Sequence, residues 1–485
     1  MVERPAQAPT ESARSLPLVV DLDGTLTPAD TLMESLIALV KQSPLNLLRV
    51  PLRLLNGRAR FKDWVAASAG VSAEQLPYRE PLLEYLRGEK GKGRRIVLAT
   101  AAHRSIAEGV SAHLGLFDEV LATEAGRNLK GEAKLEAIRS KLGGDFVYAG
   151  DSAADAPIWK AARAAVLVGV PPGIADAIRK EVPVEREFAA EGNRLSAWMS
   201  ALRIHQWLKN LLVFVPLLTA FSFLDVWKLL TTVIAFFAFS FAASASYVLN
   251  DLWDLENDRA HPRKHLRPFA SGRLPIVQGL VVAAAALAVA LALASAVSRS
   301  FLLILLLYLA LTSAYSWLLK ERALIDVLTL SLLYTLRILA GSVAIALPAS
   351  SWLLAFSAFM FLSLALVKRC AELVWLQQSG AEVAPGRDYR VSDLAVLWPL
   401  GVGAALSAVV VFGLFISAPE TRPRYATPEL LWLVALGLVY WLARLWIKTS
   451  RGKMDDDPLV YAIEDSGSAM AVSFMVAITL IAHFY

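Results

Sequence analysis

The sequence has almost no cysteine. Cys370 is the only one among 485 residues, which excludes an internal disulfide framework. The six histidines form no cluster with cysteine at a spacing used by zinc sites. Charged residues make up only 19% of the chain, whereas 56% of residues are hydrophobic, too many for an ordinary globular protein. This balance indicates a membrane domain joined to a soluble one.

The first 190 residues lack long hydrophobic runs. Their first apolar segment, residues 16–22, is short and is followed by acidic residues, so we expect no secretion signal and a cytoplasmic N-terminal domain. From Leu211 onwards, apolar runs of about twenty residues recur between short polar connections. The net charge of +5 is modest, and we expect no nucleic-acid partner.

Residues 15–185 alternate between β-rich and helical patterns. Such alternation predicts an open, mostly parallel α/β sheet, whose ligands bind at the carboxyl ends of the strands. We expect strands at 16–22, 95–100, 119–123, 146–150 and 165–169, and helices at 105–114, 132–142 and 154–163.

Four carboxylates are expected at one edge of this sheet. Because they would repel one another strongly without a hard cation, we expect Mg²⁺ among them. A carboxylate in such a site can attack phosphorus, while a lysine and a hydroxyl neutralise the phosphoryl oxygens. The residues in question are Asp21, Asp23, Asp151 and Asp155, together with Thr100 and Lys134.

The order of these motifs closely resembles the haloacid-dehalogenase (HAD) superfamily: Asp-x-Asp-x-Thr, a threonine, a lysine, then Gly-Asp-x-x-x-Asp. The resemblance implies a Rossmann-like phosphohydrolase with a magnesium site. It implies that Asp21 is the nucleophile, Asp23 the general acid/base, Thr100 the phosphate-binding hydroxyl and Lys134 the neutralising lysine, for which Lys130 competes; Asp21, Asp23, Asp151 and Asp155 are the expected metal residues.

A small helical cap is expected at residues 30–89, directly after the first motif, and suggests a small phosphomonoester substrate. The alternative is that the domain has lost its activity and serves as a scaffold. A decayed site usually loses a carboxylate first, and none is missing here.

Residues 186–206 are expected to form a linker and an interfacial amphipathic helix, because Trp198 and Arg203 suit the membrane interface. Residues 207–485 then form an all-α transmembrane domain with nine expected helices. The spans fall near 207–223, 229–249, 276–297, 300–318, 323–346, 351–367, 394–417, 428–446 and 466–484.

Basic residues set the expected orientation of these spans. Connections after even-numbered spans carry fourteen lysines and arginines, and connections after odd-numbered spans carry four. Positive residues concentrate on the cytoplasmic side, so the even connections are expected there, on the same side as the soluble domain. We therefore expect a multi-pass protein of the cytoplasmic (inner) membrane with its active sites facing the cytoplasm.

An acidic ladder follows the second span. Asn250, Asp254 and Asp258 recur at spacings of four, so on a continuing helix they share one face. Carboxylates so placed repel unless a divalent cation bridges them to an anion, and a magnesium-diphosphate group meets that demand. A basic loop at 261–273 follows and could hold phosphates. A solvated loop that only enforces topology would explain the basic residues but not the ladder.

The pattern Asn-Asp-x-x-Asp-x-x-x-Asp at 250–258, among nine spans, resembles the UbiA superfamily of intramembrane prenyltransferases over nearly all of residues 200–485. The resemblance implies ionisation of a diphosphate with magnesium and transfer of the resulting carbocation. It implies catalytic roles for Asn250, Asp251, Asp254 and Asp258, with Asn250, Asp254 and Asp258 as metal ligands.

The chain departs from ordinary members after the sixth span, where Lys368 and Arg369 replace aspartates. Fixed cations there favour a donor with an additional phosphate. With the patterns at 203–210, 261–268 and 336–341, this departure resembles the decaprenyl-phosphate phosphoribosyltransferase branch, although tyrosine is expected at Cys370. The alternative is a snorkelling pair at a span end.

That branch implies transfer of 5-phosphoribosyl from phosphoribosyl diphosphate to a polyprenyl phosphate, with the soluble domain dephosphorylating the product or a related sugar phosphate. A prenyltransferase with an aromatic or lipid acceptor, or a cation-binding transport or scaffold protein, remains an alternative. The acceptor's length and the oligomeric state stay open. The expected substrate-binding residues are Arg259, Lys264, Arg267, Tyr315, Lys320, Arg337, Lys368, Arg369 and Glu372; Arg337 is included because a cation in an apolar helix is usually functional.

Overall fold

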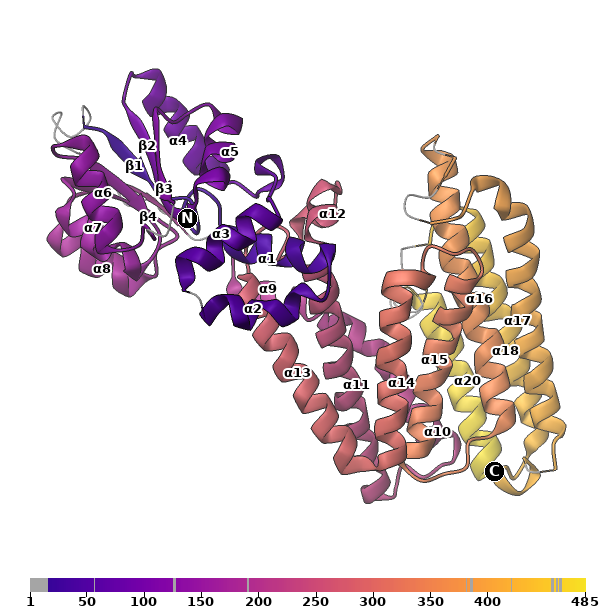
Figure 1. Cartoon of the computed structure of the whole chain (residues 1–485). Coiled ribbons are helices and arrows are strands. Elements are labelled where there is room, and N and C mark those ends of the chain that lie inside the picture. Colours follow the sequence, from indigo (N-terminus) through magenta and orange to yellow (C-terminus); the bar gives the residue numbers. More distant parts are fainter. Residues whose placement is uncertain are drawn as a thin grey trace. The chain divides into compact units, whose positions relative to one another are not determined.

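The structure is a computed structural model and describes residues 16–55, 57–124, 128–189, 192–380, 382–383, 387–419, 421–454, 458, 461 and 465–485 (Figure 1). Its contacts divide the chain into two compact units. Unit 1 contains residues up to Leu202 and Tyr247–Ala283, and unit 2 contains Arg203–Ser246 and Ala284–Tyr485. Helices α11 (Val226–Trp253) and α13 (Ile276–Val297) run through both units.

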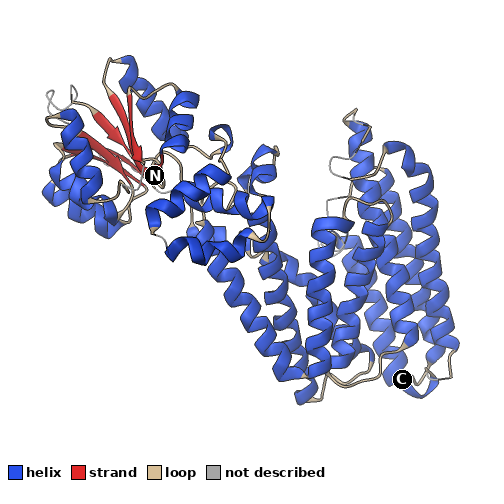
Figure 2. Cartoon of the chain, in the orientation of Figure 1, coloured by secondary structure: helices blue, strands red, loops and turns tan. Residues whose placement is uncertain are grey.

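A parallel sheet of six strands forms the centre of the soluble part of unit 1 (Figure 2). Its order is β3-β2-β1-β4-β5-β6, as in doubly wound α/β folds, which confirms the predicted fold class. The last strand was not predicted, and it extends the sheet beyond residue 185. The strands are β1 (Leu18–Val20), β2 (Ile96–His103), β3 (Glu119–Thr123), β4 (Val147–Gly150), β5 (Ala164–Val168) and β6 (Val184–Phe188).

Alternate residues of the central strands enter two separate cores, because successive side chains of a strand point to opposite faces. Val20 and Leu98 pack on one face, and Val19 and Val97 pack on the other. The first face is covered by α4 (Glu80–Gly91) and α5 (Arg104–Leu114), and the second by α6 (Glu132–Leu142), α7 (Ala156–Ala161) and α8 (Pro172–Glu181).

The cap is shorter than predicted. Helices α1 (Thr31–Gln42), α2 (Asn46–Leu55) and α3 (Arg58–Ser68) pack around their own cluster, which ends at Ala69. Helix α4, which the sequence assigned to the cap, instead buries Leu82 and Leu86 in the core of the sheet. The predicted boundary at residue 89 was wrong because the helical pattern alone does not tell which core a helix joins.

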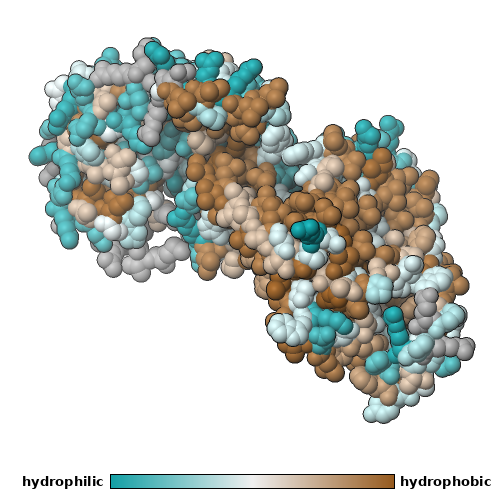
Figure 3. All heavy atoms as spheres, turned by 60° about the horizontal axis from the view of Figure 1, so that its bottom comes forward, coloured by the Kyte–Doolittle hydropathy of each residue, from teal (hydrophilic) through white to brown (hydrophobic). Residues whose placement is uncertain are grey.

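Eight helices in the described residues are long and apolar enough to cross a membrane, so the chain is a multi-pass membrane protein. Hydrophobic residues cover much of the helical surface in Figure 3. The spans are α11, α13, α14 (Arg299–Ala314) with its continuation to Leu319, α15 (Ile325–Ala344), α16 (Ser351–Gln378), α17 (Leu394–Ser417), α18 (Leu431–Ser450) and α20 (Ser466–Phe484).

The first of the nine predicted spans is not a regular α-helix. Helix α9 (Arg194–Ala201), which was predicted to lie in the membrane interface, ends two residues before Arg203, whose backbone is left-handed with a φ of 49°. A 3₁₀ helix, η4 (Ile204–Phe214), and the short α10 (Val215–Thr219) follow. At about 2 Å per residue, the eleven residues of η4 extend about 22 Å. The segment is therefore long for its residue count, although it lacks the length and regularity of the other spans.

Candidate hydrolase and transferase sites

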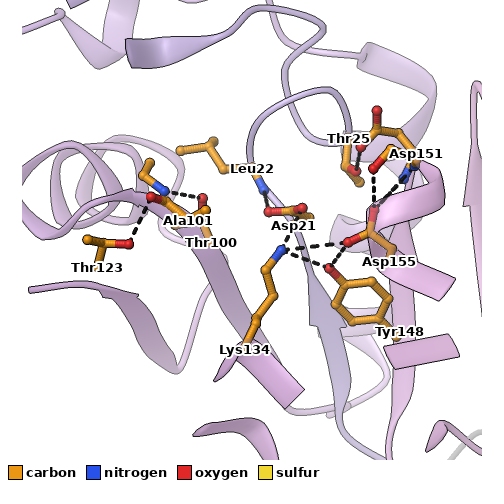
Figure 4. Close-up of polar contacts among 12 residues, drawn as sticks. Asp21, Leu22, Thr25, Thr100, Ala101, Thr123, Lys134, Tyr148, Asp151 and Asp155 are labelled. Atoms are coloured by element: carbon orange, nitrogen blue, oxygen red, sulfur yellow. Dashed lines mark hydrogen bonds and ion pairs between the residues drawn. The ribbon is translucent and has the colours of Figure 1, made fainter. Parts of the chain in front are cut away.

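Three carboxylates of the predicted hydrolase site meet where the strand order reverses. Asp21 follows β1 and Asp151 follows β4, and these two strands are neighbours in the sheet. Such a reversal is the usual ligand site of an open parallel sheet. One oxygen from each of Asp21, Asp151 and Asp155 lies within 4.8 Å of the other two (Figure 4). The structure thus brings together three of the four predicted metal residues.

Lys134 is bound directly to this group. Its Nζ lies 2.7 Å from Asp21 Oδ2 and 3.7 Å from Asp155 Oδ1. It also donates to the hydroxyl of Tyr148 at 3.0 Å, and that hydroxyl donates to Asp155 Oδ1 at 2.8 Å. Of the two lysines that competed in the sequence, Lys134 is the one that contacts the Asp21 carboxylate. Tyr148 was not predicted, although its place in β4, two residues before Gly150, was a usable signal.

Negative charge in this group exceeds what Lys134 balances. Burial raises the pKa of Asp151 to about 7, and the neighbouring carboxylates of Asp155 and Asp21 raise it further. Burial also raises the pKa of Asp21, against the opposing effect of Lys134. A divalent cation with oxygen ligands would relieve this repulsion. The donor set therefore fits Mg²⁺.

Gly24 makes room for one of these carboxylates. Its backbone has a φ of +81°, and a Cβ at this position would lie 2.3 Å from Asp151 Oδ2. No other residue fits between Asp23 and Thr25 without displacing the Asp151 carboxylate. The hydroxyl of Thr25 instead donates to Asp151 Oδ1 at 3.2 Å.

Asp23 and Thr100 each accept a hydrogen bond from a backbone N–H group. Asp23 accepts a hydrogen bond from the backbone N–H of Thr31 at 3.0 Å, which joins it to the first residue of α1. Burial raises the pKa of Asp23 to about 7, with a smaller contribution from Asp30. Thr100 is fully buried, and its hydroxyl accepts from the N–H of Ala102 at 3.0 Å. The predicted roles of Asp23 and Thr100 remain predictions.

The cap closes a cavity of about 370 Å³ over these residues. Lys62 of α3 lines it and donates to the carbonyl of Ala101 at 2.6 Å and to Asn128 Oδ1 at 2.9 Å. Lys130 and His103 also line the cavity. Sequence reasoning missed Lys62, because nothing in the helical pattern distinguishes it from a solvated lysine.

One residue interrupts the helix that carries the acidic ladder. Helix α11 ends at Trp253, and α12 (Leu255–Ala260) begins after Asp254, which stands at its N-cap position without a side-chain capping bond. Asn250 Nδ2 still reaches Asp254 Oδ2 at 3.3 Å. The N–H of Asp254 bonds to the carbonyl of Asn250 at 2.9 Å, and the N–H of Asp258 bonds to the carbonyl of Asp254 at 2.8 Å, so the predicted four-residue spacing holds along the backbone. The carboxylate of Asp258 binds a further residue.

Arg267 is that partner. Its Nη1 lies 2.7 Å from Asp258 Oδ2 and 3.2 Å from Asp251 Oδ1, and both aspartates are buried. The structure therefore joins one member of the basic loop to two members of the acidic ladder. Lys264 lies in the short 3₁₀ helix η5 (Lys264–Leu266) and is exposed.

Arg259 contacts the cap of the hydrolase, which belongs to the same unit. Its guanidinium donates to both oxygens of Glu34 in α1, at 2.8 and 2.6 Å, and its Nε donates to the carbonyl of Ala270 at 2.9 Å. Both side chains of the ion pair are at least nine-tenths buried. Lys41 of the same helix lies 3.4 Å from Glu256. Phosphate binding by Arg259 stays a prediction, since its donors have protein partners.

In unit 2, Arg369 is part of a buried ionic network. Helix α16 continues to Gln378, so Arg369 lies inside the helix and not at a span end as predicted. It is fully buried, 2.5 Å from Asp326 Oδ2, and it also pairs with Glu372. Tyr389 donates to Asp326 Oδ1 at 2.6 Å. The snorkelling alternative is therefore excluded for Arg369, while Lys368, one residue earlier, is half-buried.

Arg337 has protein partners for its buried charge. It donates to Asn210 Oδ1 at 2.9 Å, to the carbonyl of Leu333 at 2.7 Å and to the hydroxyl of Tyr308 at 3.0 Å. Tyr315 opens a π-helical turn (Tyr315–Leu319) that ends next to Lys320. Such turns are frequent at functional sites.

Comparison with known families decides the class of the membrane part. Residues 211–464, more than half of the chain, match the UbiA prenyltransferase family. The chain belongs to the UbiA prenyltransferase family. Residues 18–160 match the haloacid dehalogenase-like hydrolases, so this UbiA family member carries a hydrolase domain ahead of its membrane part. Both resemblances drawn from the motifs are confirmed.

Relatives of this UbiA protein differ in how much of it they share. The uncharacterized protein y4nM of Sinorhizobium fredii is 39% identical over 482 residues, 96% of this chain and 91% of the relative. Nodulation protein NoeC of Azorhizobium caulinodans is 35% identical over 57% of this chain and 89% of its own length. The decaprenyl-phosphate phosphoribosyltransferase of Mycolicibacterium smegmatis is 34% identical over 46% of this chain and 71% of its own length.

Proposed function

We propose that the membrane domain transfers a 5-phosphoribosyl group from phosphoribosyl diphosphate to a polyprenyl phosphate. The similarity to decaprenyl-phosphate phosphoribosyltransferase carries this proposal. An oxygen of the acceptor phosphate forms a bond to C1 of the ribose, and the bond from C1 to the diphosphate oxygen breaks. The acceptor phosphate is already an anionic nucleophile, so no general base is required.

Asn250, Asp251, Asp254 and Asp258 are the proposed residues for the leaving group. Magnesium held there would neutralise the diphosphate and stabilise it as it departs. The contact of Arg267 with Asp251 and Asp258 supports a role for it beside the diphosphate, with Lys264 as a second cation.

Unit 2 supplies further proposed substrate-binding residues. We assign Lys368 to a phosphate of the donor, because its neighbour Arg369 is already neutralised by Asp326 and Glu372. Tyr315 and Lys320 are weaker proposals, resting on the π-helical turn between them.

The hydrolase domain is proposed to remove the 5-phosphate of the lipid-linked product or of a related sugar phosphate. Asp21 attacks the phosphorus, the bond from phosphorus to the ester oxygen breaks, and Asp23 gives that oxygen a proton. Water then hydrolyses the resulting acyl phosphate. Lys134 holds Asp21 and neutralises charge. The presence of every motif carboxylate, three of them clustered, supports activity over a scaffold role.

We propose that the protein lies in the cytoplasmic membrane with its hydrolase domain and acidic ladder on the cytoplasmic side. The distribution of basic residues supports this orientation. The ion pair between Glu34 and Arg259 also supports it, because the two residues can pair only on the same side of the membrane.

Purified full-length protein in lipid nanodiscs tests the reaction class. With Mg²⁺, labelled phosphoribosyl diphosphate and polyprenyl phosphate, we expect a labelled lipid, which the hydrolase then dephosphorylates. Transfer from a prenyl diphosphate to an aromatic acceptor, with phosphoribosyl diphosphate ignored, would overturn the proposal in favour of an ordinary prenyltransferase.

A further inference from the structure

Helix α2 of the cap exposes an apolar face. None of its residues is buried, and Leu48, Leu52 and Leu55 are 72%, 66% and 83% exposed. In the described part of residues 16–189, every exposed large hydrophobic side chain lies in or next to this helix. These side chains are Leu45, Leu47, Leu48, Leu52, Leu54 and Leu55.

The helix is nevertheless firmly attached to the cap. Asn46 Nδ2 donates to the carbonyl of Leu39 in α1 at 3.0 Å. Val50 packs against the core of the cap, which contains Phe61. The exposed leucines are therefore not the result of a detached segment, because the opposite side of α2 is held in place.

The sequence of α2 divides cleanly into two exposed faces. Leu48, Leu52 and Leu55 follow one another at spacings of four and three and share a face. Arg49 and Arg53 lie four residues apart and border this face on one side, and the guanidinium of Arg53 also lies 5.6 Å from the ring centre of Trp64. An exposed leucine face bordered by arginines is typical of helices that lie in a membrane interface, and is rare on a soluble monomer.

The neighbouring helix α1 is joined to the ends of two membrane helices within unit 1. Its Met33 and Ile37 pack against the cluster that includes Leu252 of α11 and Ile276 of α13. Its Glu34 forms the buried ion pair with Arg259. The cap is thus tied to the C-terminal end of α11 and the N-terminal end of α13, and α2 packs against that anchored helix.

We propose that α2 inserts its leucine face into the headgroup region of the membrane, with Arg49 and Arg53 binding the phosphates of anionic lipids. The cap also covers the hydrolase cavity, to which α1 contributes Ser35 and α3 contributes Lys62. Membrane contact of α2 would hold this cavity next to the bilayer. The substrate class that follows, a phosphomonoester attached to a membrane lipid, rests on the proposed function of the hydrolase.

A spin label on α2 tests the membrane contact without any enzymatic activity. In the full chain with Cys370→Ser, a nitroxide is attached at Leu52→Cys or, as a control, at Lys180→Cys on α8, which is exposed. The protein is reconstituted into vesicles of phosphatidylcholine and phosphatidylglycerol. We expect the label at 52 to collide with oxygen more than with a water-soluble nickel complex, and the label at 180 to show the reverse.

Two results would overturn the proposal. A label at 52 that is as accessible to nickel as the control would place α2 in water. Spin–spin broadening at 52 that vanishes on dilution with unlabelled protein would show that a second copy covers the leucines. In vesicles of phosphatidylcholine alone, we expect a shallower label, because the arginines lose their anionic partners.

A second experiment tests the substrate class. Leu48→Ser with Leu52→Ser changes only exposed side chains, so hydrolysis of p-nitrophenyl phosphate should be retained. Hydrolysis of the lipid-linked phosphate should fall by about tenfold or more. The reason is that a cap detached from the membrane no longer holds the cavity where the lipid-linked substrate is concentrated. An equal rate on the lipid substrate would refute the membrane-held substrate. If the wild type cleaves p-nitrophenyl phosphate but no lipid-linked phosphate, the proposed function fails, while the label at 52 still decides the position of α2.

Discussion

The two acidic sites of unit 1 hold their cation at different places. In the hydrolase, the carboxylates of Asp21, Asp151 and Asp155 share Lys134, which leaves an excess of negative charge. In the ladder, Asp251 and Asp258 share Arg267, and Asp254 adds a third carboxylate, so this site also keeps an excess of negative charge. In the hydrolase the three carboxylates lie close enough together to hold a cation before any substrate arrives. A site whose aspartates already hold an arginine must rearrange, or use its remaining members, Asn250 and Asp254, to bind metal.

The largest expected effect is at Asp21. Because an amide is a far poorer nucleophile than a carboxylate, Asp21→Asn should lower hydrolysis of a small phosphomonoester by about 10³-fold or more. Phosphoribosyl transfer by the same preparation serves as the control and should be unchanged. If Asp21→Asn also abolished transfer, the two sites would not work separately, which would contradict the assignment of one reaction to each site.

Asp254→Asn should have nearly as large an effect on transfer. Asp254 is the half-exposed aspartate of the ladder, whereas Asp251 and Asp258 are buried and pair with Arg267, so the carboxylate of Asp254 is the one expected to bind metal. We expect transfer to fall by about 10²-fold or more in a magnesium-containing assay, with phosphomonoester hydrolysis intact. Retained transfer would assign the metal to other residues.

We expect Arg369 to stabilise the fold and Lys368 to bind the donor. Removing Arg369 takes away the nearest cation from the buried Asp326 and leaves it Tyr389 and the more distant Arg387, so Arg369→Ala should cost about 3–5 kcal/mol of stability, measured by unfolding in detergent micelles. Lys368→Ala should cost less stability than Arg369→Ala, because Lys368 is only half-buried, and should raise the KM for phosphoribosyl diphosphate by roughly tenfold or more, since one charge-assisted contact is lost. An unchanged KM for the Lys368 variant would remove it from the proposed donor site.

The ion pair between Glu34 and Arg259 should give a smaller but measurable coupling. In a double-mutant cycle with Glu34→Ala and Arg259→Ala, we expect a coupling of about 0.5–3 kcal/mol in the unfolding of the full chain. The exposed pair Glu80–Arg87, with a similar 2.6 Å separation, is the matched control and should couple by less than about 1 kcal/mol. Equal coupling in both cycles would mean that burial does not strengthen the contact between cap and ladder.

The sequence predicted the hydrolase site well because its residues follow strands. A strand end fixes where a side chain lies, so Asp21 and Asp151 could be placed from sheet topology, whereas Lys134, in the first turn of α6, was placed from motif order. Tyr148 and Lys62 were missed, because their contacts depend on which side chains face them across the fold. Spacing within one segment carries no such information.

The ladder was predicted in its spacing but not in its contacts. Its four-residue repeat holds along the backbone, whereas the ion pairs of Arg267 with Asp251 and Asp258 depend on how the basic loop folds back. Likewise, the partner of Arg369 comes from α15 and could not be inferred from α16. In both cases the charges were recognised, but their partners lay in other segments.

The 3₁₀ helix η4 has three residues in each turn, so its bundle-facing side chains form a straight row. Trp207 donates to Ser244, Asn210 joins Ser240 and Arg337, and Val213 is fully buried. The carbonyl of Val213 lies where a side chain on Gly341 would have to be. Inserting one residue would rotate the following row by a third of a turn and remove each partner at once. The segment that anchors Arg337 is therefore more sensitive to its length than to the identity of most of its residues.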